Sequence, residues 1–160
     1  MIYLIGVDHK IQHSANLTKR KKKLLAKFRS YLEDQIKQLE IELLAEEFSA
    51  HAVKLCNVTE STLQSIAKRI GIEHRFCDPD LDERAALGIS KSDFDKRELE
   101  WVKRINKSSD RNVLFLCGGN HIVSFMNLLK DSGILVELIS DGWGDELVGE
   151  NIFEPVEPDD

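Results

Sequence analysis

Apolar runs alternate with amphipathic segments along this chain, and the alternation is its clearest structural signal. The first run, at residues 2–7, is almost continuously apolar, which is typical of a strand buried on both faces of a parallel sheet. Four further short apolar runs follow at intervals. The pattern predicts five strands, at residues 2–7, 41–48, 74–77, 113–117 and 134–139.

The segments between these runs carry apolar residues at helical spacing. The longest predicted helix covers residues 18–40, and its bases precede its acids, which opposes the helix dipole and suggests another use for the bases. A second helix at 59–70 has Ser61 and Gln64 at capping-box spacing and Gly71 as its stop. Two more helices are predicted, from Ser92 and from His121. Residues 80–91 are predicted to be an irregular loop and 140–144 a turn.

Strands that alternate with helices predict an α/β fold, in which a mostly parallel sheet of about five strands lies between two helical layers. The chain has 160 residues, 42% of them hydrophobic and 31% charged, which fits one soluble domain and excludes a disordered chain. We expect this three-layer α/β/α domain to span residues 1–144, and residues 145–160 to be a flexible acidic tail.

The charge of the chain is concentrated at its end. Residues 141–160 hold eight of the 28 acidic residues and none of the 22 Lys and Arg, so the rest of the chain is nearly neutral. A nearly neutral body argues against nucleic acid as the main partner, because phosphate binding needs a clustered excess of bases. One such cluster does exist, at residues 19–23.

The cysteines and the apolar runs bear on the compartment. Cys56, Cys77 and Cys117 are odd in number and lie in apolar surroundings, as expected for reduced core thiols of a cytoplasmic protein. No apolar run is long enough to span a membrane, and the start of the chain lacks the basic leader of a secretory signal. Cys117 could act as a nucleophile beside His121, but its apolar strand favours a core position.

Polar residues that could perform chemistry gather after the predicted strands. Parallel strands place their carboxyl ends at one edge of the sheet, so these residues should converge there. At least two histidines and three carboxylates belong to this set, which can bind a divalent metal or activate a water molecule. The set contains Asp8, His9, His13, Glu46, Glu47, Asp78, Asp80, Gly118, Gly119, Asn120, His121, Asp141 and Trp143.

A Gly-x-x-His pattern occurs twice directly after an apolar strand, from Gly6 to His9 and from Gly118 to His121. We expect each glycine to let the backbone turn sharply, so that the histidine faces the cleft. A third copy ends at His74, but it precedes its strand and therefore lies at the opposite edge, so we set it aside.

Three segments, YLIGVDH at 3–9, LLAEEFS at 43–49 and VLFLCGGNH at 113–121, resemble the TraB, Tiki, erythromycin esterase and ChaN-like superfamily. The resemblance implies an α/β scaffold with His9 and His121 as site histidines and Glu46 and Glu47 as the acidic pair. Tiki-like members are metal-dependent proteases, erythromycin esterase members are hydrolases in which a histidine activates water, and ChaN-like members bind haem iron. The superfamily therefore does not define the reaction.

These observations predict a small hydrolase acting on a small molecule or a peptide. His9, Glu46 and His121 are the expected catalytic residues, and a divalent metal of unspecified identity would be held by His9, Glu46, Glu47 and His121. Since neighbouring strand residues face opposite ways, only one glutamate faces the cleft, and we place Glu46 there with Glu47 as its helper. The expected supporting residues are Asp8, His13, Asp78, Arg84 and Arg97. Arg97 and its neighbour Glu98 would orient the acidic pair or an anionic substrate, or else lie on an exposed helix face.

Two other functions remain open. In the first, Gly118, Gly119 and Asn120 bind a nucleotide or another anion through backbone N–H groups, with the bases at 19–23 as a charge clamp. However, the chain lacks both the dinucleotide fingerprint and the P-loop lysine. In the second, the acidic tail binds a regulatory partner. The sequence leaves open whether the chain forms a homo-oligomer.

Overall fold

The computed structural model describes residues 1–106 and 110–144 of the chain. Five strands form a single sheet in the order β3-β2-β4-β1-β5, and every neighbouring pair is parallel. The strands are β1 (Ile2–Val7), β2 (Leu43–Glu46), β3 (Glu73–Phe76), β4 (Val113–Gly118) and β5 (Val136–Trp143). The predicted α/β class with a parallel sheet of about five strands is therefore confirmed.

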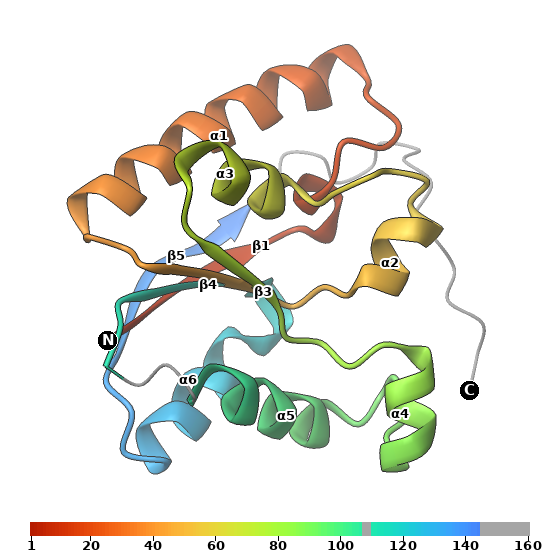
Figure 1. The fold of residues 1–160 in the computed structure, drawn as a ribbon, viewed down its shortest axis with the longest axis vertical. Coiled ribbons are helices and arrows are strands. Elements are labelled where there is room, and N and C mark those ends of the chain that lie inside the picture. Colours follow the sequence, from red (N-terminus) through yellow and green to blue (C-terminus); the bar gives the residue numbers. More distant parts are fainter. Residues whose placement is uncertain (107–109, 145–160) are drawn as a thin grey trace.

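Helices cover both faces of the sheet, as Figure 1 shows. α1 (Lys19–Gln38) and α3 (Thr62–Ile70) lie on one face, and α5 (Phe94–Asn106) and α6 (Ile122–Asp131) lie on the other. The short elements are η1 (His9–Gln12), α2 (Ala50–Leu55), α4 (Leu81–Leu87) and η2 (Gly119–His121).

The alternation of side chains along the strands produces two separate hydrophobic cores. In β2, Leu44 packs in the core with α1 and α3, whereas Leu43 and Ala45 pack in the core with α5 and α6. The same alternation continues to the end of β2, so that the two consecutive glutamates point into different layers.

One lysine in the basic first turn of α1 has a structural role. Thr18 caps the helix by accepting a hydrogen bond from the Lys21 N–H. The Lys21 side chain is fully buried, and its Nζ donates to the Ala15 carbonyl at 2.7 Å. This base therefore secures the loop that leads into α1.

Three segments differ from the sequence-based prediction. The predicted irregular loop at 80–91 contains α4, which Asp80 and Glu83 cap reciprocally and Gly88 ends in the left-handed conformation. The predicted turn at 140–144 belongs mostly to β5, which stays paired with β1 as far as Trp143 through two irregularities in register. α2, capped by Ser49, was not predicted.

The order of the strands opens a crevice at the carboxyl edge of the sheet. β1 and β4 are neighbours, but the chain leaves β1 toward α1 on one face and leaves β4 toward α6 on the other. Diverging connections of this kind leave the space in which α/β proteins bind their ligands.

Among the described residues, no helix combines the length and the apolarity that crossing a membrane requires. The predicted acidic tail at 145–160 lies outside the described residues.

Candidate functional site

Glu47 stands at the centre of the carboxyl edge, directly after β2. Its Oε1 accepts a hydrogen bond from Arg97 Nη2 at 2.8 Å and lies 3.3 Å from His121 Nε2. Its Oε2 accepts from the Gly118 N–H at 2.7 Å and lies 3.8 Å from His9 Nε2. Burial would raise the pKa of Glu47, but the hydrogen bond from His121 and the charges of His9, His121 and Arg97 outweigh it and lower the pKa to about 2. Glu47 is therefore ionised at neutral pH, and its carboxylate is the common partner of Arg97, Gly118 and the two histidines.

His121 is buried between two carboxylates. Its Nδ1 lies 2.6 Å from Glu98 Oε1, which also accepts from the Ser124 hydroxyl at 2.6 Å. The ring also packs against Phe94 and Trp101. Burial would lower the pKa of His121, but the hydrogen bonds to Glu47 and Glu98 raise it to about 9. At neutral pH the ring is thus an imidazolium that donates one proton to each glutamate.

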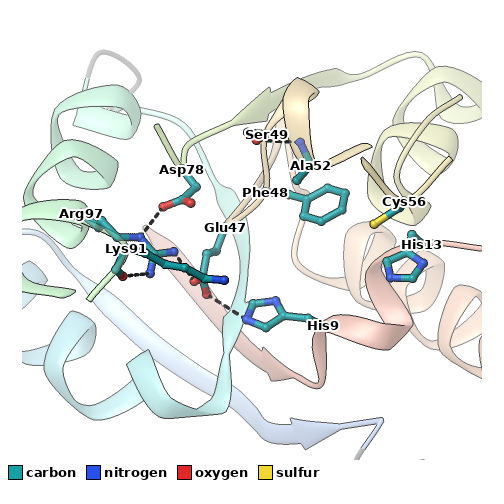
Figure 2. Close-up of a pocket in the computed structure, with 10 residues that line it drawn as sticks. All are labelled: His9, His13, Glu47, Phe48, Ser49, Ala52, Cys56, Asp78, Lys91 and Arg97. Atoms are coloured by element: carbon teal, nitrogen blue, oxygen red, sulfur yellow. Dashed lines mark hydrogen bonds and ion pairs between the residues drawn. The ribbon is translucent and has the colours of Figure 1, made fainter. Parts of the chain in front are cut away.

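Arg97 joins Glu47 to the end of β3. Its Nε donates to Asp78 Oδ1 at 3.0 Å, and its Nη1 donates to the Lys91 carbonyl at 3.1 Å. The Trp101 indole donates to the same Asp78 oxygen at 2.9 Å. Figure 2 shows Arg97 between Asp78 and Glu47. With all three of its nitrogens engaged, Arg97 is a rigid positioning group.

His9 reaches the same carboxylate from the opposite side. It begins η1, whose first turn is capped by Asp8 through a hydrogen bond from the Lys10 N–H. Its Nδ1 lies 2.6 Å from Gln12 Oε1, and its side chain is 47% exposed, against 4% for Glu47. Of the two site histidines, His9 is therefore the one that a substrate can reach.

The two glycines of the Gly-x-x-His patterns are required by close contacts, not by a sharp turn. Neither has a positive φ. A Cβ on Gly118 would lie 2.8 Å from His9 Nε2 and 3.3 Å from Glu47 Oε2. A Cβ on Gly6 would lie 2.6 Å from the Asp141 carbonyl oxygen of β5. Gly118 thus leaves room for His9, and Gly6 lets β5 approach.

Glu46 lies in the other layer, apart from His121. Its carboxylate is fully buried and accepts hydrogen bonds from the Ser61 hydroxyl and, at 2.8 Å, from His74 Nε2. Its other oxygen accepts from Gln12 Nε2 at 3.1 Å. The strand alternation that we used to separate the two glutamates therefore directs Glu47, not Glu46, toward the two histidines.

The predicted supporting residues have different surroundings. His13 is buried, stacks on Phe48 and accepts a hydrogen bond from the Ala15 N–H. Burial and the nearby charge of Lys21 lower its pKa to about 4. Asp78 is largely shielded from solvent against Arg97, and this desolvation raises its pKa. Arg84 is buried in α4 and does not line the site.

Two cavities adjoin these side chains. The larger, of about 440 Å³, is lined by residues on both sides of the crevice, including Gly118, Gly119, Asn120 and His121. The smaller, of about 150 Å³, extends toward an apolar wall of Phe48, Ala52 and Cys56 (Figure 2). Both are lined by His9, Glu47, Lys91 and Arg97, so these four residues stand where the cavities meet.

The donor set does not fit the predicted four-ligand metal centre. Among residues 1–106 and 110–144, no three His, Cys, Asp or Glu side chains are arranged to hold one cation. Both ring nitrogens of His121 face carboxylates, and Glu46 lies in the other layer. The remaining pair, His9 Nε2 and Glu47 Oε2, offers two ligands where protein zinc sites use three or four.

The remaining residues are the cysteine that was considered as a nucleophile and the side chains that the sequence did not assign to the site. Cys117 is fully buried, and burial raises its pKa well above the ordinary value, which excludes a reactive thiolate. Gln12, Lys91 and Trp101 were not predicted, and for Glu98 the sequence left open an orienting role or an exposed helix face; the structure buries it. Glu98 precedes the buried residues Trp101, Val102 and Ile105 by three, four and seven positions, so the helical period alone could have revealed it.

The chain matches no protein-family model, no curated protein and no solved structure.

Proposed function

We propose that this protein is a hydrolase in which His9 activates a water molecule for attack on a carbonyl or phosphoryl centre. One observation carries the proposal: His9 Nε2 faces the buried carboxylate of Glu47 at 3.8 Å, at the place where the two cavities meet. An imidazole beside a fixed carboxylate is the arrangement that accepts a proton near neutral pH and stabilises the charge that forms.

His9 suits the role of general base better than the other titratable groups of the site. Glu47 has a pKa of about 2 and is committed to Arg97 and Gly118, so it takes up a proton poorly. His121 has a pKa of about 9 and already carries its second proton at neutral pH. His9 is half-exposed and lines both cavities, and its Nε2 faces Glu47.

The proton balance of the proposed reaction is simple. His9 Nε2 takes one proton from water while the water oxygen bonds to the carbonyl carbon or the phosphorus atom. The imidazolium then returns this proton to the departing alcohol, amine or phosphate oxygen, as the bond to the leaving group breaks. Glu47 stays ionised throughout and stabilises the imidazolium, while Arg97 and His121 keep the carboxylate in place.

Two features indicate the substrate. Figure 2 shows the Lys91 side chain extending toward Glu47, and Lys91 lines both cavities, where an ammonium group would stabilise a developing oxyanion. The apolar wall of Phe48, Ala52 and Cys56 on the opposite side suits a small apolar group. We therefore infer a small molecule or short peptide with an apolar part next to its scissile bond.

A nucleotide-binding role is less well supported. The Gly118 N–H, which would contact a phosphate, already donates to Glu47. None of the described residues that line either cavity belongs to the basic run at 19–23.

A panel of chromogenic carboxylic esters, peptide anilides and phosphate esters tests the proposal. We expect turnover of at least one class, and a loss of about 10²-fold or more in His9→Gln, since general base catalysis contributes this much. His51→Gln is the matched control, because His51 lies on α2 and lines neither cavity. Equal turnover by the wild type and His9→Gln would refute the role of His9.

Elemental analysis and dialysis against a chelator address the metal that the sequence predicted. On the donor set described above, we expect turnover to survive chelation. A stoichiometric metal whose removal abolishes turnover would replace the proposed direct activation of water by a metal-assisted one.

A further inference from the structure

A continuous chain of polar contacts connects His9 to Glu46, the glutamate that lines neither of the two cavities. His9 Nδ1 lies 2.6 Å from Gln12 Oε1, and Gln12 Nε2 donates to Glu46 Oε2 at 3.1 Å. Gln12 and Glu46 are both fully buried. These contacts cross from η1, which follows β1, to the end of β2.

The partners of Gln12 determine which way its amide points. The nitrogen of an amide only donates and its oxygen only accepts. Gln12 Nε2 faces Glu46 Oε2 and, at 3.4 Å, the Glu47 carbonyl oxygen, which both accept. A reversed amide would place its oxygen against these two oxygens. Gln12 Oε1 is therefore the end that faces His9.

The orientation of Gln12 in turn fixes the tautomer of His9. Because Gln12 Oε1 can only accept, the proton of the neutral His9 ring sits on Nδ1. The lone pair is then on Nε2, the nitrogen that lies 3.8 Å from Glu47 Oε2. This is the tautomer that a general base at this position requires.

Glu46 cannot easily turn away from Gln12. Its other oxygen accepts hydrogen bonds from Ser61, which caps α3, and from His74 in β3. Both donors belong to regular elements of the fold, so the carboxylate is held from two sides. Glu46 Oε2 is thereby kept within hydrogen-bond distance of the Gln12 amide.

We propose that Glu46 is a positioning residue that sets the tautomer of His9 through Gln12. Both glutamates of the pair then act on His9. Glu47 lies directly opposite Nε2, and Glu46 acts on Nδ1 through Gln12. The catalytic consequence rests on the proposed function of His9, whereas the assignment of the tautomer does not.

Nitrogen-15 NMR of the full-length protein with labelled histidine tests the assignment, at a pH where His9 is neutral. The two tautomers give different ring nitrogen shifts and different couplings to the ring protons. We expect the Nδ1–H form for His9 in the wild type. In Glu46→Gln the new amide can donate to Gln12, so the Gln12 amide reverses and the Nε2–H form of His9 becomes populated.

A second variant and a control keep the test decisive. Gln12→Leu removes the acceptor and leaves Glu46 with Ser61 and His74, so it should produce the same change of tautomer if Glu46→Gln folds poorly. Glu60→Gln makes the same substitution at a surface ion pair and should leave the His9 signals unchanged. An Nε2–H form in the wild type, or an unchanged tautomer in both variants, would overturn the inference.

Turnover separates the tautomer from its catalytic use. Where the tautomer changes as expected, we expect the kcat of the His9-dependent reaction to fall by about 10²- to 10⁴-fold, as it does when a catalytic histidine is held in the wrong tautomer. A changed tautomer with unchanged kcat would overturn the positioning role. If instead His9→Gln has no effect on turnover, the proposed function fails, while the NMR result still decides the tautomer.

Discussion

The imidazole of His121 and the carboxylate of Glu98 lie 2.6 Å apart, and their side chains are only 4% and 2% exposed. Together with Glu47 at the other ring nitrogen, Glu98 makes His121 a buried cation, and both of its ring protons are directed at carboxylates. Its chemical task is therefore to hold Glu47, and its protonation is linked to the stability of the fold.

The pKa of His121 predicts a loss of stability at alkaline pH. Its value of about 9 in the folded protein exceeds the ordinary 6.5, so the folded state binds the proton more tightly. The resulting stabilisation is complete below pH 6.5 and disappears as the pH rises through 9. Urea unfolding should therefore show a difference between the wild type and His121→Gln that is largest at pH 6 and shrinks by pH 9.5. A difference that does not change with pH would contradict this.

Neutralising Glu47 should destabilise the protein strongly. Glu47→Gln leaves the buried charges of Arg97 and His121 without their shared partner, and breaking such a group typically costs about 3 kcal/mol or more. Chemical denaturation at pH 6.5 measures this directly. Glu60→Gln, at the exposed pair with Lys68, should change the free energy of unfolding by less than about 1 kcal/mol. Similar losses of unfolding free energy in both variants would show that Glu47 does not stabilise the buried charges of Arg97 and His121.

A methyl group on Gly118 should displace His9 without unfolding the protein. The new Cβ would lie 2.8 Å from His9 Nε2, and the half-exposed ring can move outward at the expense of its contact with Gln12. We expect large shifts of the His9 ring signals and a matching loss of turnover, with little change in the thermal midpoint. Gly119→Ala is the control, since its nearest neighbour lies at 3.4 Å, and it should leave the His9 signals in place.

The same substitution at Gly6 should act on stability. Its Cβ would lie 2.6 Å and 2.9 Å from backbone atoms of Asp141, which cannot move without disturbing the pairing of β1 with β5. Crowding of this kind costs about 1 to 3 kcal/mol. Thermal unfolding of Gly6→Ala checks the value, and an unchanged midpoint would mean that β5 adjusts freely.

The features that the sequence reveals best are those set by local periodicity. The run at 2–7 coincides with β1, and Gly71 ends α3 in the left-handed conformation, because strand burial and helix capping depend on neighbouring residues. α4 was missed although Asp80 and Glu83 have the spacing of a capping box, since the helix is short and largely exposed. β5 continues past residue 139 because β1 is available to pair with it, which no local pattern reveals.

The sequence predicts the residues of the site only where they directly follow a strand and so lie at the carboxyl edge of the sheet. The sequence places His9, Glu47 and His121 at one edge, and the structure brings all three together. The sequence cannot decide between Glu46 and Glu47. Strand alternation predicts that they face different layers, but it does not say which layer the histidines approach. Gln12 carries no signal of its own, because its importance comes from a contact with Glu46 across 34 positions of sequence.

The side chains around Glu47 come from both halves of the chain, with His9 and Glu47 supplied before α4 and Arg97, Gly118 and His121 after it. Neither half contains the whole cluster, and the carboxylate of Glu47 from the first half is paired with Arg97 and His121 from the second. If the chain were divided in the exposed stretch around Gly88 and the two pieces recombined, turnover would measure their reassembly. The proposed activity would thus report completed folding, since no single segment carries all the residues that it needs.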